Sequence, residues 1–364
     1  MSKKNLWLNM SAYSLAHALV DAACVAALFA IVTPKLADLA YANQLILIYD
    51  VIAFAPQPIF GLLVDAIKAP ARMAAVGMLL VAASLLMMQA PLPAMVMAGI
   101  GNAIFHAGGG YASLKLAPGK ASLPGIFVAP GALGLTLGIL IGKSGGFVAW
   151  PFQLLLLSLA GFMLVLPRLE VQAPAQRPLP ANGDLRWFEM VIVLLLLSVA
   201  IRSLVGQSLV LPWKSQPSLL LALTLAVVLG KALGGLLADR FGWAAVGVSG
   251  LVVSLPLLAF FDPLPALVIL GTFLFNLSMP VTLICLAEML PGKSGFAFGL
   301  SALAIIIGAL PAFLPLQALT GAPAFIFAAI LVSIAALYSG LRLYQRHFQA
   351  DRPALPHRAQ LEEQ

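Results

Sequence analysis

The stretch GLLVDAIKAPAR at residues 61–72 returns in related form as GLLADRFGWAA at residues 235–245. Each copy follows a long apolar run. Each reads Gly-Leu-Leu, then a small apolar residue, then an aspartate, which is Asp65 in the first copy and Asp239 in the second. The repeat predicts that the chain consists of two structurally related halves.

The composition indicates an integral membrane protein. Of the 364 residues, 62% are hydrophobic and only 9% are charged, whereas a soluble domain carries about 25% charged residues. The two cysteines, Cys24 and Cys285, both lie in apolar runs. They predict neither a disulfide framework nor a cysteine-based metal site.

The apolar runs predict the number of membrane crossings, because a helix needs about 20 apolar residues to span a bilayer. Twelve runs meet this length: 8–34, 41–66, 70–89, 93–115, 122–142, 148–167, 188–211, 217–239, 243–262, 264–288, 294–318 and 321–345. The expected fold class is therefore an all-α membrane protein with twelve transmembrane helices in two six-helix, pseudo-symmetric halves.

One long polar interval, RLEVQAPAQRPLPANGDLRW, separates the first six runs from the last six. Its prolines and charges are typical of a linker. The expected organisation is an N-terminal half at 1–167, a linker at 168–187, a C-terminal half at 188–345 and a tail at 346–364.

Lysine and arginine residues are concentrated in the loops on one side of the predicted membrane, and this bias predicts that this side is cytoplasmic. That side receives the N-terminus, the linker and the tail. We therefore expect a multi-pass protein of the bacterial inner membrane with both termini cytoplasmic. The same placement accounts for the net charge of +7 without a nucleic-acid partner.

The repeated stretch resembles the signature of the major facilitator superfamily, which is Gly, three residues, Asp, two residues and Gly, followed by basic residues. The second copy matches at Gly235, Asp239, Arg240 and Gly242. The first copy matches at Gly61 and Asp65, but Lys68 stands where the second glycine is expected. The resemblance implies a gating role for these residues. It also implies that the first, fourth, seventh and tenth helices line a central cavity.

Polar residues occur in those four predicted helices at similar depth. They are His17 and Asp21 in the first, Asn102 and His106 in the fourth, Arg202 and Gln207 in the seventh, and Asn276 in the tenth. Both pairs that contain a histidine are spaced i,i+4, so each pair shares one helix face. This pattern predicts a binding site near the middle of the membrane.

Two further charges, Asp50 and Lys231, lie within predicted spans. A charge at the bilayer centre costs about 2.5–3.5 kcal/mol on insertion scales, so these groups must face a cavity or each other. A structural interpretation stays open beside the functional one: Asp50 and Lys231 could form packing or gating ion pairs. His17 with Asp21, and likewise His106, could be buried structural groups.

Two short segments resemble the fosmidomycin-resistance branch of the superfamily. They are AHALVD at 16–21 and GIGNAIFHAGGG at 99–110, matched through His17, Asp21, Gly101, Phe105 and His106. The run Ala107–Gly110 departs from the more polar stretch expected there. GIFVAPGALG at 125–134 is also similar to the fifth helix of that branch.

Glycines recur at four-residue steps in two spans, as Gly134, Gly138 and Gly142 and again as Gly230 and Gly234. Stripes of small residues let helices approach closely. Two interpretations are open, a sliding interface between the halves or ordinary packing within one half.

Sequence motifs for catalysis are missing. GKSGG at 142–146 and GKSG at 292–295 lack the earlier glycine of a phosphate loop, and the chain contains no His-Glu-x-x-His and no Gly-x-Ser-x-Gly. We expect no enzyme activity, no cofactor and no metal.

The sequence therefore predicts a monomeric secondary active transporter that moves a small solute by alternating access. Asp21 is the leading proton carrier, modulated by His17 and with Asp50 as the next candidate. Arg202 suits an anionic solute, with Asn102, His106, Gln207, Asn276 and Lys231 as further binding residues. Proton-coupled efflux is favoured over proton-coupled uptake. A lipid or amphiphile flippase, a membrane-embedded enzyme and a non-transporting sensor are the other classes considered.

Overall fold

The computed structural model of the chain describes residues 2–35, 38–167 and 185–349. Its described residues form helices and connecting turns. The α-helices are α1 Lys3–Val32, α2 Leu39–Phe54, α3 Gln57–Ile67, α4 Pro70–Ser84, α5 Pro91–Leu116, α6 Ser122–Lys143, α7 Ala149–Val165, α8 Leu185–Ser208, α9 Pro217–Phe241, α10 Trp243–Phe260, α11 Pro265–Asn276, α12 Ser278–Met289, α13 Ser294–Ala309, α14 Gln317–Thr320 and α15 Pro323–Tyr344. A short π-helix, Gln345–Gln349, follows α15.

Ten helical segments are long and apolar enough to cross a membrane. The apolar helix α7 has 17 residues, and α5 has 26 residues with more polar content. When α5 and α7 are added to the ten candidate spans, the number of segments is consistent with the twelve that the sequence predicts. The expected linker at 168–187 and the tail at 346–364 lie largely outside the described residues, so the three domain boundaries stay predictions.

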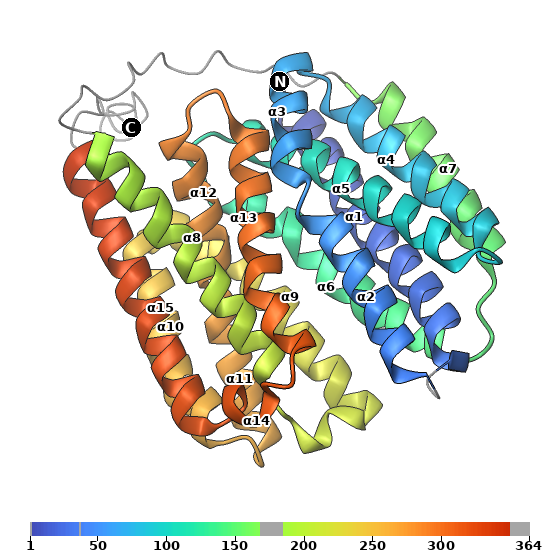
Figure 1. Cartoon of the computed structure of the whole chain (residues 1–364). Coiled ribbons are helices and arrows are strands. Elements are labelled where there is room, and N and C mark those ends of the chain that lie inside the picture. Colours follow the sequence, from blue (N-terminus) through green and yellow to red (C-terminus); the bar gives the residue numbers. More distant parts are fainter. Residues whose placement is uncertain (1, 36–37, 168–184, 350–364) are drawn as a thin grey trace.

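The helices form two groups that lie side by side (Figure 1). One group contains α1–α7 and the other contains α8–α15. The two meet where α6 packs along α9 and where α13 packs on α3 and α5. We call the side where α7 ends and α8 begins the linker side; it is at the top of Figure 1.

Proline sets the start of five helices. Pro70, Pro91, Pro217, Pro265 and Pro323 each occupy the first helical position. Proline is favoured there because the first N–H groups of a helix have no partner within the helix, and its fixed φ suits helix entry. The starts of the expected spans at 70, 122, 217, 243 and 294 agree with the structure.

Two of the expected spans, 41–66 and 264–288, agree with the candidate membrane spans Ala40–Ile67 and Pro265–Met289, and each contains an internal break. The first divides into α2 and α3 at Pro56, and the second divides into α11 and α12 at Leu277. Pro56 lacks the N–H that would continue the helix, and Pro280 removes the partner of the Asn276 carbonyl. The expected span 294–318 is longer than the helix that forms there, because α13 ends at Ala309 and a short 3₁₀ turn follows.

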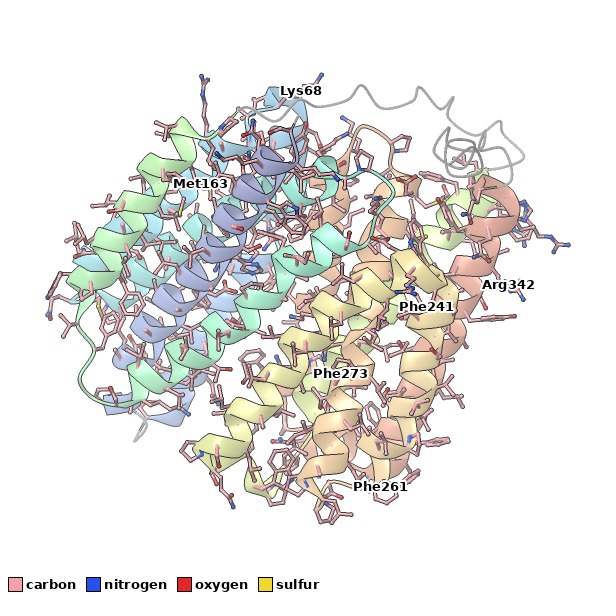
Figure 2. The ribbon with its side chains drawn as sticks, turned by 180° about the vertical axis from the view of Figure 1, so that it is seen from behind. Lys68, Met163, Phe241, Phe261, Phe273 and Arg342 are labelled. Carbon is pink, nitrogen blue, oxygen red and sulfur yellow. The ribbon has the colours of Figure 1, made fainter. Side chains whose placement is uncertain are left out.

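The position of Lys68 explains the departure of the first signature copy. Lys68 ends α3 in the left-handed conformation with φ 52° and ψ 35°. Gly242, its counterpart, ends α9 with φ 97°. Both copies thus turn the chain through positive φ, and only the second uses glycine. Lys68 lies on the linker side, at the opposite end of the molecule from Phe261 (Figure 2).

We predict that Lys68→Gly stabilises the protein by up to about 1 kcal/mol, because a non-glycine residue in this region costs about 1–2 kcal/mol. The measurement is the thermal unfolding midpoint of the detergent-purified protein. Gly242→Ala should lower the midpoint, since no atom lies within 4 Å of the added Cβ and only backbone strain is introduced. A lower midpoint for Lys68→Gly would contradict this account.

Candidate functional site

Helix α1 places His17 and Asp21 on the face that packs against α6. The glycines of α6 make this packing close: Cβ atoms at Gly138 and Gly142 would lie 2.7 and 2.6 Å from the carbonyl oxygens of Ala22 and Ala26. The stripe on α6 therefore packs within the first half. The stripe on α9 likewise packs on α11 within the second half, against Phe273 and Leu277. Of the two interpretations of these stripes, packing within one half is correct.

A proline in α6 opens its backbone to α1. Pro130 has no N–H, so the carbonyl of Ile126 lacks its helical donor. The hydroxyl of Ser14 lies 3.4 Å from that oxygen. One residue further, Nδ1 of His17 lies 2.7 Å from the carbonyl oxygen of Phe127. The backbone of α6 thus fixes the imidazole ring of His17.

Helix α5 brings the second polar pair to the same place. Nδ1 of His106 lies 3.0 Å from the carbonyl oxygen of Asn102, one turn earlier. The Asn102 amide donates to Oδ1 of Asp21 at 3.1 Å and to the hydroxyl of Tyr49 on α2 at 3.2 Å. Both i,i+4 pairs predicted from the sequence therefore meet.

The structure joins three titratable side chains in one buried cluster, which we call the His-Asp-His cluster: His17, Asp21 and His106. Nε2 of His17 lies 3.2 Å from Oδ2 of Asp21, and Nε2 of His106 lies 3.7 Å from Oδ1. The two Nε2 atoms are 2.9 Å apart. The residues are only 5%, 6% and 7% exposed. With donor atoms within 4.8 Å of one another, the cluster has dimensions that suit a proton or another small cation.

Gly131 leaves the space that the cluster occupies. A Cβ there would overlap Nε2 of His17 and lie 2.8 Å from Oδ2 of Asp21. Any side chain at this position would push against the cluster itself rather than against backbone.

Aromatic rings cover the cluster and reach the second half of the protein. The ring centroid of Phe127 lies 4.7 Å from that of His17 and 5.9 Å from that of Phe298 on α13. Phe105 packs beside both His17 and His106. A single ring, Phe127, thus connects the cluster with a helix of the other half.

Arg202 on α8 is a buried cation in the second half, 8% exposed. Its Nε donates to the carbonyl of Ser198 at 3.2 Å, and its terminal nitrogens donate to the hydroxyls of Ser278 at 2.5 Å and Thr282 at 2.7 Å. Among the described residues, no carboxylate lies within 4.0 Å of it. Hydrogen bonds orient the guanidinium, but no described group balances its charge.

The two hydroxyls are oriented by α12. Ser278 donates to the carbonyl of Phe275 and Thr282 donates to the carbonyl of Ser278, both at 2.9 Å. Their lone pairs therefore face Arg202. Ser278 is the first residue after the break at Leu277, so the broken helix supplies the support for this cation.

The other predicted binding residues form no described hydrogen bond with the His-Asp-His cluster or with Arg202. Asn276 donates to the carbonyl of Thr272 in its own helix at 2.8 Å, and Gln207 is exposed near the end of α8. Within the described part of the chain, neither Asp50 nor Lys231 has an ion-pair partner within 4.0 Å.

The signature aspartates bind helix N-termini across the two halves. The carboxylate of Asp65 accepts from the backbone N–H groups of Gly295 and Phe296 at the start of α13, both at 2.9 Å. Carboxylates are favoured at helix N-termini because of the helix dipole. A Cβ at Gly61 would overlap the carbonyl of Gly295, so glycine permits this approach.

The second copy makes the matching contact. Asp239 accepts from the N–H groups of Ala121 and Ser122 at the start of α6, at 2.7 and 3.0 Å. Gly235 contacts Ala121 as Gly61 contacts Gly295. Arg240 is exposed and lies over the ring of Phe241. The two copies together hold the halves against each other on the linker side.

Sequence reasoning missed several residues that build these sites. They are Tyr49, Phe127, Gly131, Ser278, Thr282 and Phe298. The adjacent Pro130 and Gly131 were a usable signal, since a proline within a helix frees a carbonyl and a glycine admits a close neighbour. The hydroxyls and aromatic rings carry no comparable signal in a membrane protein.

Comparison with solved structures identifies the fold. The human organic anion transporter MFSD10 is 16% identical, with a TM-score of 0.71, covering 93% of this chain and 100% of that one. The E. coli fucose:proton symporter FucP is 14% identical, with a TM-score of 0.64, covering 91% and 97%. FucP in the outward conformation gives a TM-score of 0.59 at 14% identity, covering 91% and 99%.

These likenesses show that the chain has the fold of major facilitator superfamily transporters. At such low identity they establish the fold alone. No protein-family model matches the sequence, and no curated protein matches it significantly. These structural likenesses do not confirm the fosmidomycin-resistance branch, so that resemblance stays a prediction.

We predict that Gly131→Ala lowers the thermal unfolding midpoint, with a cost of about 1–3 kcal/mol typical of overpacking, because the methyl group displaces His17 and Asp21. Gly161→Ala on α7 is the matched control. Its Cβ meets no atom within 4 Å, and alanine favours a helix more than glycine does. Equal effects of the two substitutions would contradict the placement of Gly131.

Proposed function

We propose that the chain is a secondary active transporter that moves a small solute across the bacterial inner membrane by alternating access and is coupled to protons. The observation that carries this proposal is the His-Asp-His cluster, three titratable groups buried together in helices of a transporter fold. Titratable groups inside a membrane are costly and are typical of ion and proton pathways.

The buried Arg202 supports an anionic group on the solute. A guanidinium without a balancing carboxylate gains most from a carboxylate or phosphonate, which it can bind with two parallel hydrogen bonds. Ser278 and Thr282 hold it in place. Asn276, Gln207 and Lys231 stay proposed as further binding residues, and Asp50 stays a second candidate for proton coupling.

For the direction of transport we propose efflux by exchange with protons, in line with the resemblance to the fosmidomycin-resistance branch. Uptake together with protons is the second candidate. A specific observation favours it: Arg202 and the His-Asp-His cluster have different hydrogen-bond partners, so a solute at Arg202 and a proton at the cluster need not compete.

Several finer points belong to the same proposal. Both termini are cytoplasmic, which makes the linker side the cytoplasmic side. The chain functions as a monomer and as a transporter rather than an enzyme. The domain boundaries are those that the sequence predicts, with the linker at 168–187.

The test is proton movement in proteoliposomes loaded with a pH-sensitive dye. We would add fosmidomycin, phosphonoacetate, citrate or L-fucose and record the internal pH. A solute-dependent pH change that requires the protein supports the proposal. Translocation of a fluorescent lipid without any solute-dependent pH change would favour a flippase and overturn it.

We predict that Asp21→Asn abolishes solute accumulation driven by a pH gradient, because the amide cannot supply the negative charge that a bound proton needs. Asp21→Glu should retain part of the activity with a shifted pH optimum. Asp262→Asn, in the loop at the opposite end from the linker side, is the control and should behave as wild type. Full accumulation by Asp21→Asn would exclude Asp21 from proton coupling.

We also predict that Asp65→Asn and Asp239→Asn each open the linker side. The amide replaces one acceptor oxygen with an NH₂ group, a donor that faces a backbone N–H. It also removes the negative charge that is stabilised at the helix N-terminus. Spin labels at Arg72→Cys and Phe241→Cys, both exposed and in different halves, would report the change. The distance distribution should extend to longer distances in both variants and remain unchanged in Asp262→Asn.

A further inference from the structure

The two histidines of the His-Asp-His cluster are held in the same tautomer. Nδ1 of His17 faces the carbonyl oxygen of Phe127, and Nδ1 of His106 faces the carbonyl oxygen of Asn102. A carbonyl oxygen only accepts hydrogen bonds, so each Nδ1 must carry a hydrogen. In a neutral imidazole the other nitrogen is then a bare acceptor.

The two Nε2 atoms would therefore be two acceptors pointing at each other. They lie 2.9 Å apart, which is a hydrogen-bond distance. Two lone pairs at this distance repel each other when nothing lies between them. One proton between them turns the contact into an N–H···N hydrogen bond, and the carboxylate of Asp21 lies close enough to both rings to balance the added charge.

We propose that His17 and His106 bind one proton jointly between their Nε2 atoms, while Asp21 stays a carboxylate. The claim concerns proton binding at equilibrium, and only its role in coupling rests on the proposed function. It assigns the bound proton to the two histidines and not to Asp21, which is the residue that the sequence favours.

A proton on Asp21 does not satisfy the same geometry. A protonated carboxyl could donate from Oδ2 to Nε2 of His17, 3.2 Å away. The lone pair of His106 would still have no donor from His17. In addition, Oδ1 accepts from the amide of Asn102, a contact that favours an unprotonated carboxylate. A proton between the imidazoles, in contrast, removes the repulsion between the two Nε2 atoms and leaves both oxygens of Asp21 as acceptors.

A second proton is disfavoured for the same reason. Two imidazolium rings would direct two N–H groups at each other, with a single carboxylate to balance both charges. Other charged or titratable groups lie on the neighbouring helices. They are Tyr49 and Asp50 on α2, Cys24 on α1 and Lys231 on α9. The cluster therefore binds one proton.

The chain is well suited to a direct test, since it contains only four histidines. The double variant His347→Gln/His357→Gln leaves His17 and His106 as the sole histidines. We would label it with ¹⁵N-histidine in lipid nanodiscs and record NMR spectra between pH 5 and pH 9. The expected result is an Nδ1–H on both rings and scalar coupling between the two Nε2 nuclei through one shared proton.

Two variants sharpen the measurement. His106→Gln should remove the coupling. Asp21→Asn should weaken proton binding by about ten- to a thousand-fold, the usual effect of losing an opposite charge within 4–6 Å, so that the coupling disappears at a higher proton concentration than in the parent. Asp262→Asn should leave both the coupling and its pH dependence unchanged.

Three results would overturn the proposal. The first is that both Nε2 atoms remain unprotonated and uncoupled over the whole pH range. The second is that infrared spectra assign the proton to the Asp21 carboxyl. The third is that the signals change on treatment with EDTA and return with Zn²⁺, because a metal ion would then occupy the cluster. Coupling without proton-driven transport overturns the proposed function alone, and proton-driven transport without coupling overturns the shared proton alone.

Discussion

The carboxylate of Asp21 is the charge around which the first half is arranged. It lies among helices α1, α2, α5 and α6 and is only 6% exposed, so protein groups supply its partners. The amide of Asn102 and the rings of His17 and His106 do so. This demand explains features that would otherwise be unrelated: the close approach of α1 to α6, the glycine at 131 and the contact of His17 with the carbonyl oxygen of Phe127.

The first turn of α13 connects this charge to the contact between the halves. Its N–H groups at Gly295 and Phe296 bind Asp65, and two residues later Phe298 packs on Phe127. Phe127 in turn holds His17 through both its ring and its carbonyl oxygen. A movement of α13 away from Asp65 must therefore disturb the packing over the His-Asp-His cluster. The contact that closes the linker side and the environment of the His-Asp-His cluster depend on the same helical turn.

The sequence predicted the fold class and the polar helix faces better than it predicted the contacts. Twelve apolar runs and the repeat around Asp65 and Asp239 were sufficient for the architecture, because membrane helices must satisfy their own backbone. The spacing of His17 with Asp21 was sufficient for a polar helix face. The partner of His17 is a backbone carbonyl, however, and no side chain marks it. Whether a helix is interrupted at Pro56 or Leu277 depends on its packing against neighbouring helices. The sequence of a single helix does not contain that information.

The two halves differ in a way that bears on the proposed direction of transport. With one proton, the His-Asp-His cluster is neutral: one carboxylate and one shared positive charge. Without the proton it is negative. Arg202 remains a cation in both states, with no described carboxylate near it. A proton at the cluster removes a negative charge that would repel an anion approaching Arg202, so electrostatics favours joint loading of proton and anion. Exchange requires the opposite relation, in which each excludes the other. For an anionic solute at Arg202, this arrangement of charges is thus the argument for the second candidate of the proposed function, uptake together with protons, whereas the proposed efflux by exchange requires a solute that competes with the proton by binding Asp21 itself.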